Sequence, residues 1–112
     1  MRQTLRLHPD SQCLSVVHVE VEVTRPEAHG RMLAYIATGK ISDLFMPPLG
    51  DVSRTDELWR HTCFEAFVCG LNSAFYEFNF APSTQWAAYQ FGGYRNGMRV
   101  ATEIQTPRII EL

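Results

Sequence analysis

The chain has 112 residues, a length that fits one domain. Its formal charge is −2, and its single lysine and nine arginines are scattered, so it lacks the clustered cations that nucleic acids and acidic membranes attract. We therefore predict no nucleic-acid partner and no membrane partner. The cysteines, Cys13, Cys63 and Cys69, form no C-x-x-C pair, and 1–9 lacks the apolar run of a signal peptide. Both observations favour a cytoplasmic protein with structural thiols.

Alternating side chains predict three strands in the first part of the chain. Residues 3–7 alternate and end at a turn cluster, and 32–38 is predicted to return antiparallel to the strand before it. The strongest alternation runs over 13–24, where β-branched residues with period two indicate a strand with one buried face. The residues predicted to share that face are Val17, Val19, Val21 and Val23.

The second part of the chain begins with a long loop and continues as a strand meander. Two consecutive prolines, Pro47 and Pro48, exclude a regular ladder from 41–57, and loops of this length often carry function. The predicted meander strands are 58–69, 75–81 and 85–91, followed by a weakly periodic tail over 99–112. We therefore predict an all-β chain built as an antiparallel β-sandwich.

The turn at 70–73 suggests how the first two meander strands pair. If Cys69 lies opposite Phe75, then Glu65 lies opposite Asn79 and Phe67 opposite Glu77. The alternate residues would form an apolar core face, made of Phe64, Ala66, Val68, Tyr76, Phe78 and Phe80.

Two carboxylates on one partly covered face require partners, because they repel each other and are costly to dehydrate. The candidates are the Gln85 amide, a polar ligand, or one of the arginines Arg54, Arg95 and Arg99. An internal salt-bridge network, a ligand-facing patch and an acid–base pair all remain open. Aromatic rings near the strand ends suit sugar recognition, in which carboxylates and amides bind the hydroxyls. These rings belong to Trp59, Trp86, Tyr89 and Tyr94.

The stretches LWRHTCFEAF at 58–67, YEFNFAPS at 76–83 and QWAAY at 85–89 resemble a bacterial DOMON-like family related to the family 9 carbohydrate-binding modules. The resemblance implies an antiparallel β-sandwich with a ligand site at one side of the sheet, in a family whose relatives bind sugars or haem. Thr62 stands where the sugar-binding modules usually carry an acidic residue. The resemblance also implies further strands, so 1–112 is expected to be a single sandwich domain that lacks its C-terminal strands.

The resulting hypothesis is a non-catalytic module that binds a carbohydrate or another small polar ligand, with no cofactor and no metal. The predicted ligand-binding residues are Trp59, Glu65, Glu77, Asn79, Trp86, Tyr89 and Arg95. An incomplete sandwich would leave an apolar face and strand edges uncovered, so we expect a homodimer or larger homo-oligomer. The alternatives are an assembly element without a small ligand and a haem-binding domain, although the histidines and methionines show no spacing typical of a haem or metal site.

Overall fold

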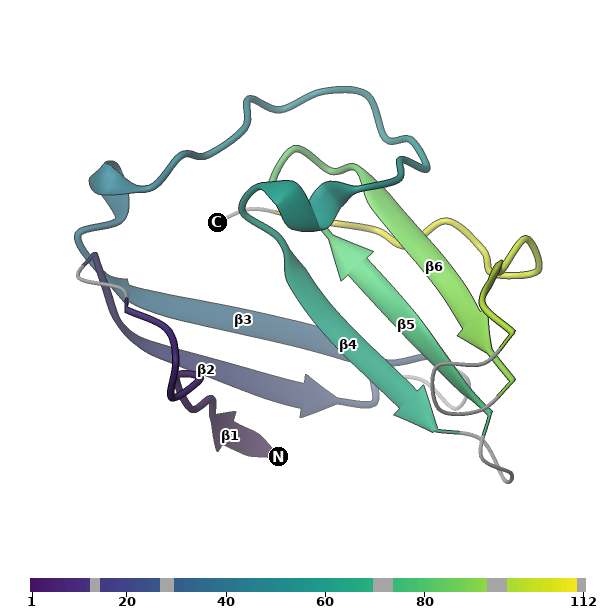
Figure 1. Ribbon diagram of the computed structural model, residues 1–112, viewed down its shortest axis with the longest axis horizontal. Helices are drawn as coiled ribbons and strands as arrows, with labels where there is room; N and C mark the ends of the chain where they lie inside the picture. Colours follow the sequence, from purple (N-terminus) through teal and green to yellow (C-terminus); the bar gives the residue numbers. More distant parts are fainter. Residues whose placement is uncertain (13–14, 27–29, 70–73, 93–96, 111–112) are drawn as a thin grey trace. The chain divides into compact units, whose positions relative to one another are not determined.

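The computed structural model describes residues 1–12, 15–26, 30–69, 74–92 and 97–110. Contacts within the chain divide it into two compact units, Met1–Leu44 and Phe45–Leu112. Each unit is built on one antiparallel sheet, of three strands in the first and four in the second (Figure 1). The described residues contain no α-helix, only two short 3₁₀ turns.

The first unit contains β1 (Arg2–Thr4), β2 (Val16–Thr24) and β3 (Met32–Gly39), followed by the 3₁₀ turn η1 (Ile41–Asp43). The long strand β2 lies in the middle and pairs antiparallel with both neighbours. Most of its side chains are half-buried on both faces, so the alternation in the sequence does not produce one buried and one solvated face.

Val17 departs from the predicted valine face. The register of β2 against β3 shifts between Val16 and His18, so Val17 is the extra residue of a bulge and is 81% exposed. Gly39 lies opposite this bulge with φ +147°, and a Cβ atom there would collide with the backbone oxygen of Ser15. The bulge therefore depends on close backbone approach at a glycine, which removes Val17 from the period-two pattern.

The second unit contains the 3₁₀ turn η2 (Leu58–Arg60) and the strands β4 (Phe64–Cys69), β5 (Phe75–Phe80), β6 (Trp86–Phe91) and β7 (Arg99–Val100). The strands pair in chain order, and Figure 1 shows β4, β5 and β6 side by side. The prediction of one strand over 58–69 is therefore wrong in its first half. Leu58 is buried in the turn, and the strand begins six residues later.

The predicted pairing of β4 with β5 is confirmed residue for residue. Glu65 lies opposite Asn79, Phe67 opposite Glu77, and Cys69 opposite Phe75. The next strand continues the ladder, and its pairs place Tyr89 beside Glu77 and Ala87 beside Asn79. The side chains of Glu65, Glu77, Asn79, Ala87 and Tyr89 therefore share one face of the sheet, which we call the acidic face.

Both faces of β6 carry buried residues. On the opposite face, Trp86 and Ala88 pack with Ala101 of the tail, and Phe78 and Phe80 are partly buried against them. On the acidic face, Ala87 and Tyr89 pack with Leu58 and Ala81. The predicted core face is confirmed near β6 but fails at the outer strand, where Val68 is 53% exposed.

The all-β antiparallel architecture predicted from the sequence is confirmed, and two antiparallel sheets are the components of a β-sandwich. The expectation of a single domain over 1–112 that lacks C-terminal strands stays a prediction.

Replacing Gly39 with Ala should lower the free energy of unfolding by at least about 2 kcal/mol, because the new Cβ collides with backbone at a positive φ. Gly50 is the matched control, since a Cβ there meets nothing within 4 Å. Its replacement by Ala should change stability by no more than about 0.5 kcal/mol. Urea titration followed by circular dichroism measures both, and equal midpoints for the two variants would contradict the bulge geometry.

Candidate functional site

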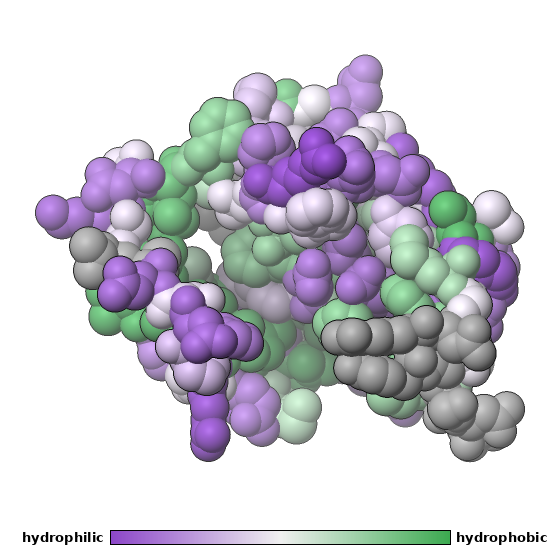
Figure 2. Space-filling model, in the orientation of Figure 1, coloured by the Kyte–Doolittle hydropathy of each residue, from purple (hydrophilic) through white to green (hydrophobic). Residues whose placement is uncertain are grey.

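A groove of about 470 Å³ lies on the acidic face of the second unit. Four carboxylates and two aromatic rings contribute to its walls, together with an amide and two apolar side chains. The lining residues are Asp56, Glu57, Trp59, Glu65, Glu77, Asn79, Tyr89, Met98 and Val100. Figure 2 shows hydrophilic surface over η2 and over the parts of β4 and β5 next to it. No lysine, arginine or histidine is among the described residues that line the groove.

The floor of the groove follows from the strand register. Successive side chains of a strand point to opposite faces, so Glu77 and Asn79, two residues apart on β5, point to the same face. Their cross-strand neighbours Glu65 and Tyr89 join them from β4 and β6. Farther along the same face the ring of Phe75 contacts those of Phe67 and Phe91, so the polar groove ends at an apolar cluster.

The loop before η2 supplies the groove's rim. Thr55 donates its backbone N–H to the carbonyl of Trp86 at 2.8 Å, and Trp86 donates to the carbonyl of Ser53 at 3.1 Å. These bonds hold the loop along the start of β6 and bring Asp56 and Glu57 to the groove. Glu57 has φ +63°, a left-handed conformation that costs a non-glycine residue free energy.

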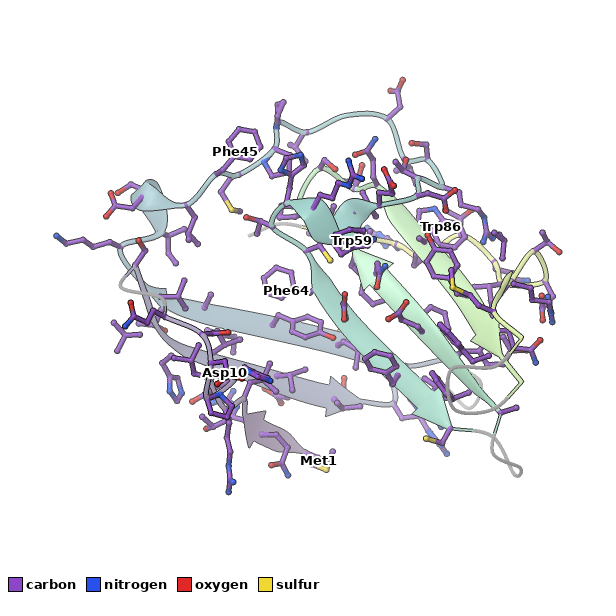
Figure 3. The ribbon with its side chains drawn as sticks, viewed as in Figure 1. Met1, Asp10, Phe45, Trp59, Phe64 and Trp86 are labelled. Atoms are coloured by element: carbon purple, nitrogen blue, oxygen red, sulfur yellow. The ribbon has the colours of Figure 1, made fainter. Side chains whose placement is uncertain are left out.

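Trp59 lies in η2 at the same rim, and Figure 3 labels it there. Its side chain is 60% exposed, although the guanidinium of Arg60 lies 5.5 Å from the ring centroid. Arg60 also forms an ion pair with Glu57 at 3.3 Å. The rim therefore presents a large exposed ring next to a carboxylate that is already paired.

Tyr89 donates its hydroxyl to the Asp56 carboxylate at 2.7 Å. Burial, and then this hydrogen bond, raise the pKa of Tyr89, so the phenol stays protonated and keeps donating. The bond stabilises one carboxylate of the groove and uses the only proton that Tyr89 can offer.

Unlike Asp56 and Glu57, Glu77 has a carboxylate that makes no hydrogen bond or ion pair with the described residues. Burial, and then the charge of Glu65, raise the pKa of Glu77. Both causes disfavour the ionised form, so Glu77 is a carboxylate that a donor or a cation would stabilise.

Asn79 is 1% exposed, and its Oδ1 atom has no hydrogen-bond partner in the described part of the chain. Its cross-strand neighbours on this face are Glu65, a carboxylate that offers acceptors, and Ala87, which is apolar. Along its own strand the nearest residue on the same face is Glu77. The register therefore places next to this buried acceptor an apolar residue and carboxylates, which offer no donor when ionised. A buried acceptor without a donor costs about 1–3 kcal/mol in a folded protein.

A second hollow of about 270 Å³ adjoins the groove and shares Asp56 and Glu57 with it. Its remaining walls come mainly from η2, from the residues that follow it, and from the turn between β5 and β6. There Ser83 and Gln85 hydrogen-bond to each other at 3.1 Å. The groove is therefore the stronger candidate site, because it holds the buried acceptor without a donor.

Five of the seven predicted ligand-binding residues line the groove, namely Trp59, Glu65, Glu77, Asn79 and Tyr89. Trp86 lies opposite Phe80, on the other face of the sheet, and is only 3% exposed. The prediction that Trp86 binds a ligand on the same face as Glu77 and Asn79 therefore does not fit the register. Arg95 and Tyr94 lie outside the described residues.

The arginines predicted to neutralise the carboxylates make other contacts where the structure describes them. Arg54 lies 4.2 Å from the ring centroid of Trp86 and donates to the carbonyls of Ala101 and Ile104. Arg99 binds Glu103 through two hydrogen bonds of 2.9 and 2.7 Å. These printed contacts of Arg54 and Arg99 are with other groups than the carboxylates of the acidic face, and Arg95 lies outside the described residues.

Four lining residues were absent from the predicted set: Asp56, Glu57, Met98 and Val100. Asp56 and Glu57 belong to a segment without periodicity, and only their place three and two residues before Trp59 could have indicated them. Among the described residues no group of three or more His, Cys, Asp or Glu side chains is arranged to hold a metal ion. The same part of the chain contains no helix long and apolar enough to cross a membrane.

Comparison of the chain with protein-family models, with curated proteins and with solved structures finds no match. The resemblance to DOMON-like modules therefore stays a prediction from the sequence, and the candidate function is argued from the groove.

Cys63 and Cys69 should differ sharply in their reaction with iodoacetamide. Burial, and then the charges of Glu65 and Glu77, raise the pKa of Cys63 to about 11, whereas Cys69 is exposed. Because the thiolate is the nucleophile, Cys63 gains reactivity only as the pH rises toward that value. At about pH 8, we expect Cys69 to react at least roughly tenfold faster.

Mass spectrometry of chymotryptic peptides separates the two positions. Unfolding the chain in urea is the control, because both thiols should then react at similar rates. Equal rates in the folded protein would contradict the placement of Cys63 beside the acidic face.

Proposed function

We propose that this protein is a non-catalytic binding module that takes a carbohydrate in the groove of the acidic face. The observation that carries the proposal is the adjacency of an exposed tryptophan to a buried amide and carboxylates that can accept hydrogen bonds. The groove volume of about 470 Å³ lies within the range of roughly 300–1,000 Å³ for small-molecule sites.

Each part of the groove suits one feature of a sugar. The apolar C–H face of a pyranose packs on a flat ring, and Trp59 offers such a ring with 60% of its surface exposed. Sugar hydroxyls are donors, and the Glu77 carboxylate and the Asn79 amide oxygen are acceptors without donors in the described chain. The resemblance to carbohydrate-binding modules favours the same ligand class.

A binding role fits these residues better than catalysis. A retaining glycosidase needs two carboxyl groups about 5–5.5 Å apart, one acting as acid and the other as nucleophile. Here Tyr89 holds Asp56 and Arg60 holds Glu57. Glu77 is the carboxylate without a partner in the described chain, and we assign it to ligand binding.

Replacing Trp59 with Ala should lower the affinity for a bound glycan about tenfold or more, equivalent to ~1.4 kcal/mol, because the stacking surface is lost. Phe45 is the matched control, since it is a ring of similar exposure, 66%, that does not line the groove. A glycan array identifies the ligand, and calorimetric titration compares the variants. An equal loss of affinity in both variants would show that Trp59 does not bind the ligand. An array without any bound glycan would refute the sugar ligand.

Assembly of two copies is a second candidate function, favoured by the character of β4. This strand ends the sheet order, and its backbone can pair with another chain at that edge. Two large apolar side chains of the strand, Phe67 and Val68, are 56% and 53% exposed. Pairing of β4 with β4 of a second copy would cover the edge and these side chains through a two-fold axis.

If β4 mediates assembly, light scattering should give twice the mass of one chain, and Val68→Lys should convert the dimer to a monomer. A lysine on an exposed edge opposes pairing because two like charges would face each other across the axis. Thr102→Lys is the control, because it adds the same charge at an exposed position outside β4. A monomer mass at every concentration of the unmodified chain would exclude this function.

A further inference from the structure

The groove offers few hydrogen-bond donors to Glu77 and Asn79, because donors close to it already serve other groups. The hydroxyl of Tyr89 already donates to Asp56, and the guanidinium of Arg60 already pairs with Glu57. Neither donor serves Glu77 or Asn79. No lysine, arginine or histidine is among the described residues that line the groove.

Two acceptors therefore lie side by side without donors in the described chain. Glu77 and Asn79 are two residues apart on β5 and point to the same face, which sets their Cβ atoms roughly 7 Å apart. Atoms at the ends of the two side chains can converge on one group between them. The group that satisfies both should supply several donors and carry positive charge.

We propose that the ligand carries a protonated primary amine, and that the sugar bound in this groove is an amino sugar whose ammonium lies between Glu77 and Asn79. The proposal rests on the carbohydrate ligand proposed above and names its chemical class. An ammonium has three donors and no acceptor, so it matches a carboxylate and an amide oxygen better than any neutral group.

A neutral sugar would satisfy the same acceptors less completely. Each hydroxyl offers one donor, and its own oxygen then needs a donor that the surrounding carboxylates cannot provide. Hydroxyls also leave the charge of Glu77 uncompensated beside that of Glu65. A charge-assisted bond from an ammonium is shorter and roughly twice as strong as one between neutral groups.

Trp59 adds a second reason for a cationic sugar. Aromatic faces attract cations, and tryptophan attracts them most strongly. The ring already lies near one cation, the guanidinium of Arg60, and remains 60% exposed. A pyranose stacked on this ring would keep its amine within the electrostatic field of both the ring and the carboxylates of the groove.

The test compares three monosaccharides that differ only at the second carbon: glucosamine, N-acetylglucosamine and glucose, as methyl glycosides. They are titrated into the full chain at neutral pH, where the free amine is largely protonated, and amide chemical shifts report binding. We expect glucosamine to bind at least about tenfold more tightly than the other two, and this advantage to shrink as salt is added.

Glu77→Gln should remove most of the preference for glucosamine while leaving the affinity for glucose within about threefold. The matched control is Glu103→Gln, which removes the same charge from a residue that does not line the groove and pairs with Arg99. The control should keep the full preference. Circular dichroism spectra establish that both variants are folded.

The outcomes separate the two proposals. Glucose and glucosamine bound with equal affinity would overturn the amino-sugar assignment and leave the carbohydrate-binding function standing. Binding of none of the three sugars, together with an empty glycan array, would overturn both. If Glu77→Gln does not fold, the comparison of the three sugars on the unmodified chain still decides the assignment.

Discussion

The candidate site depends on one constraint, the antiparallel register of β4, β5 and β6. Each strand turns alternate side chains to one face, so a single pairing decides which residues meet. The observed pairing sets Asn79 between Glu65 and Ala87, neither of which offers a donor to it. A shift by one residue would exchange this acidic face for the phenylalanines of β5. The floor of the groove, with an acceptor that has no donor in the described chain, follows from this register.

The rim of the groove depends on a different interaction, the packing of Arg54 on Trp86. The guanidinium lies 4.2 Å from the ring centroid and reaches the carbonyls of Ala101 and Ile104, so one side chain joins the loop, β6 and the tail. Backbone bonds on either side of Arg54 hold the loop against the start of β6. Trp86 thus contributes to the site from the opposite face, by fixing the loop that brings Asp56 to the groove.

The strands and the β4–β5 register could be predicted because period-two alternation and a short turn are local signals. The placement of Trp86 could not be predicted without pairing β6 as well, since its face depends on lying opposite Phe80. The bulge at Val17 depends on Gly39 of another strand, and no residue near Val17 indicates it. Asp56 and Glu57 lie in a segment without alternation, where tertiary contacts decide the conformation.

The acidic face lowers the stability of the unit that carries it. The pKa of Glu77 is higher in the folded chain than in an unfolded one. The free energy of unfolding therefore falls as the pH rises from the pKa of the unfolded chain to that of the folded chain. Asn79 adds the cost of a buried acceptor without a donor in the described chain. Apolar side chains at both positions would avoid these costs and extend the cluster of Phe75 and Phe91. A ligand that supplies the donors would offset both costs and stabilise the folded chain by mass action, which is why the arrangement suits binding better than packing.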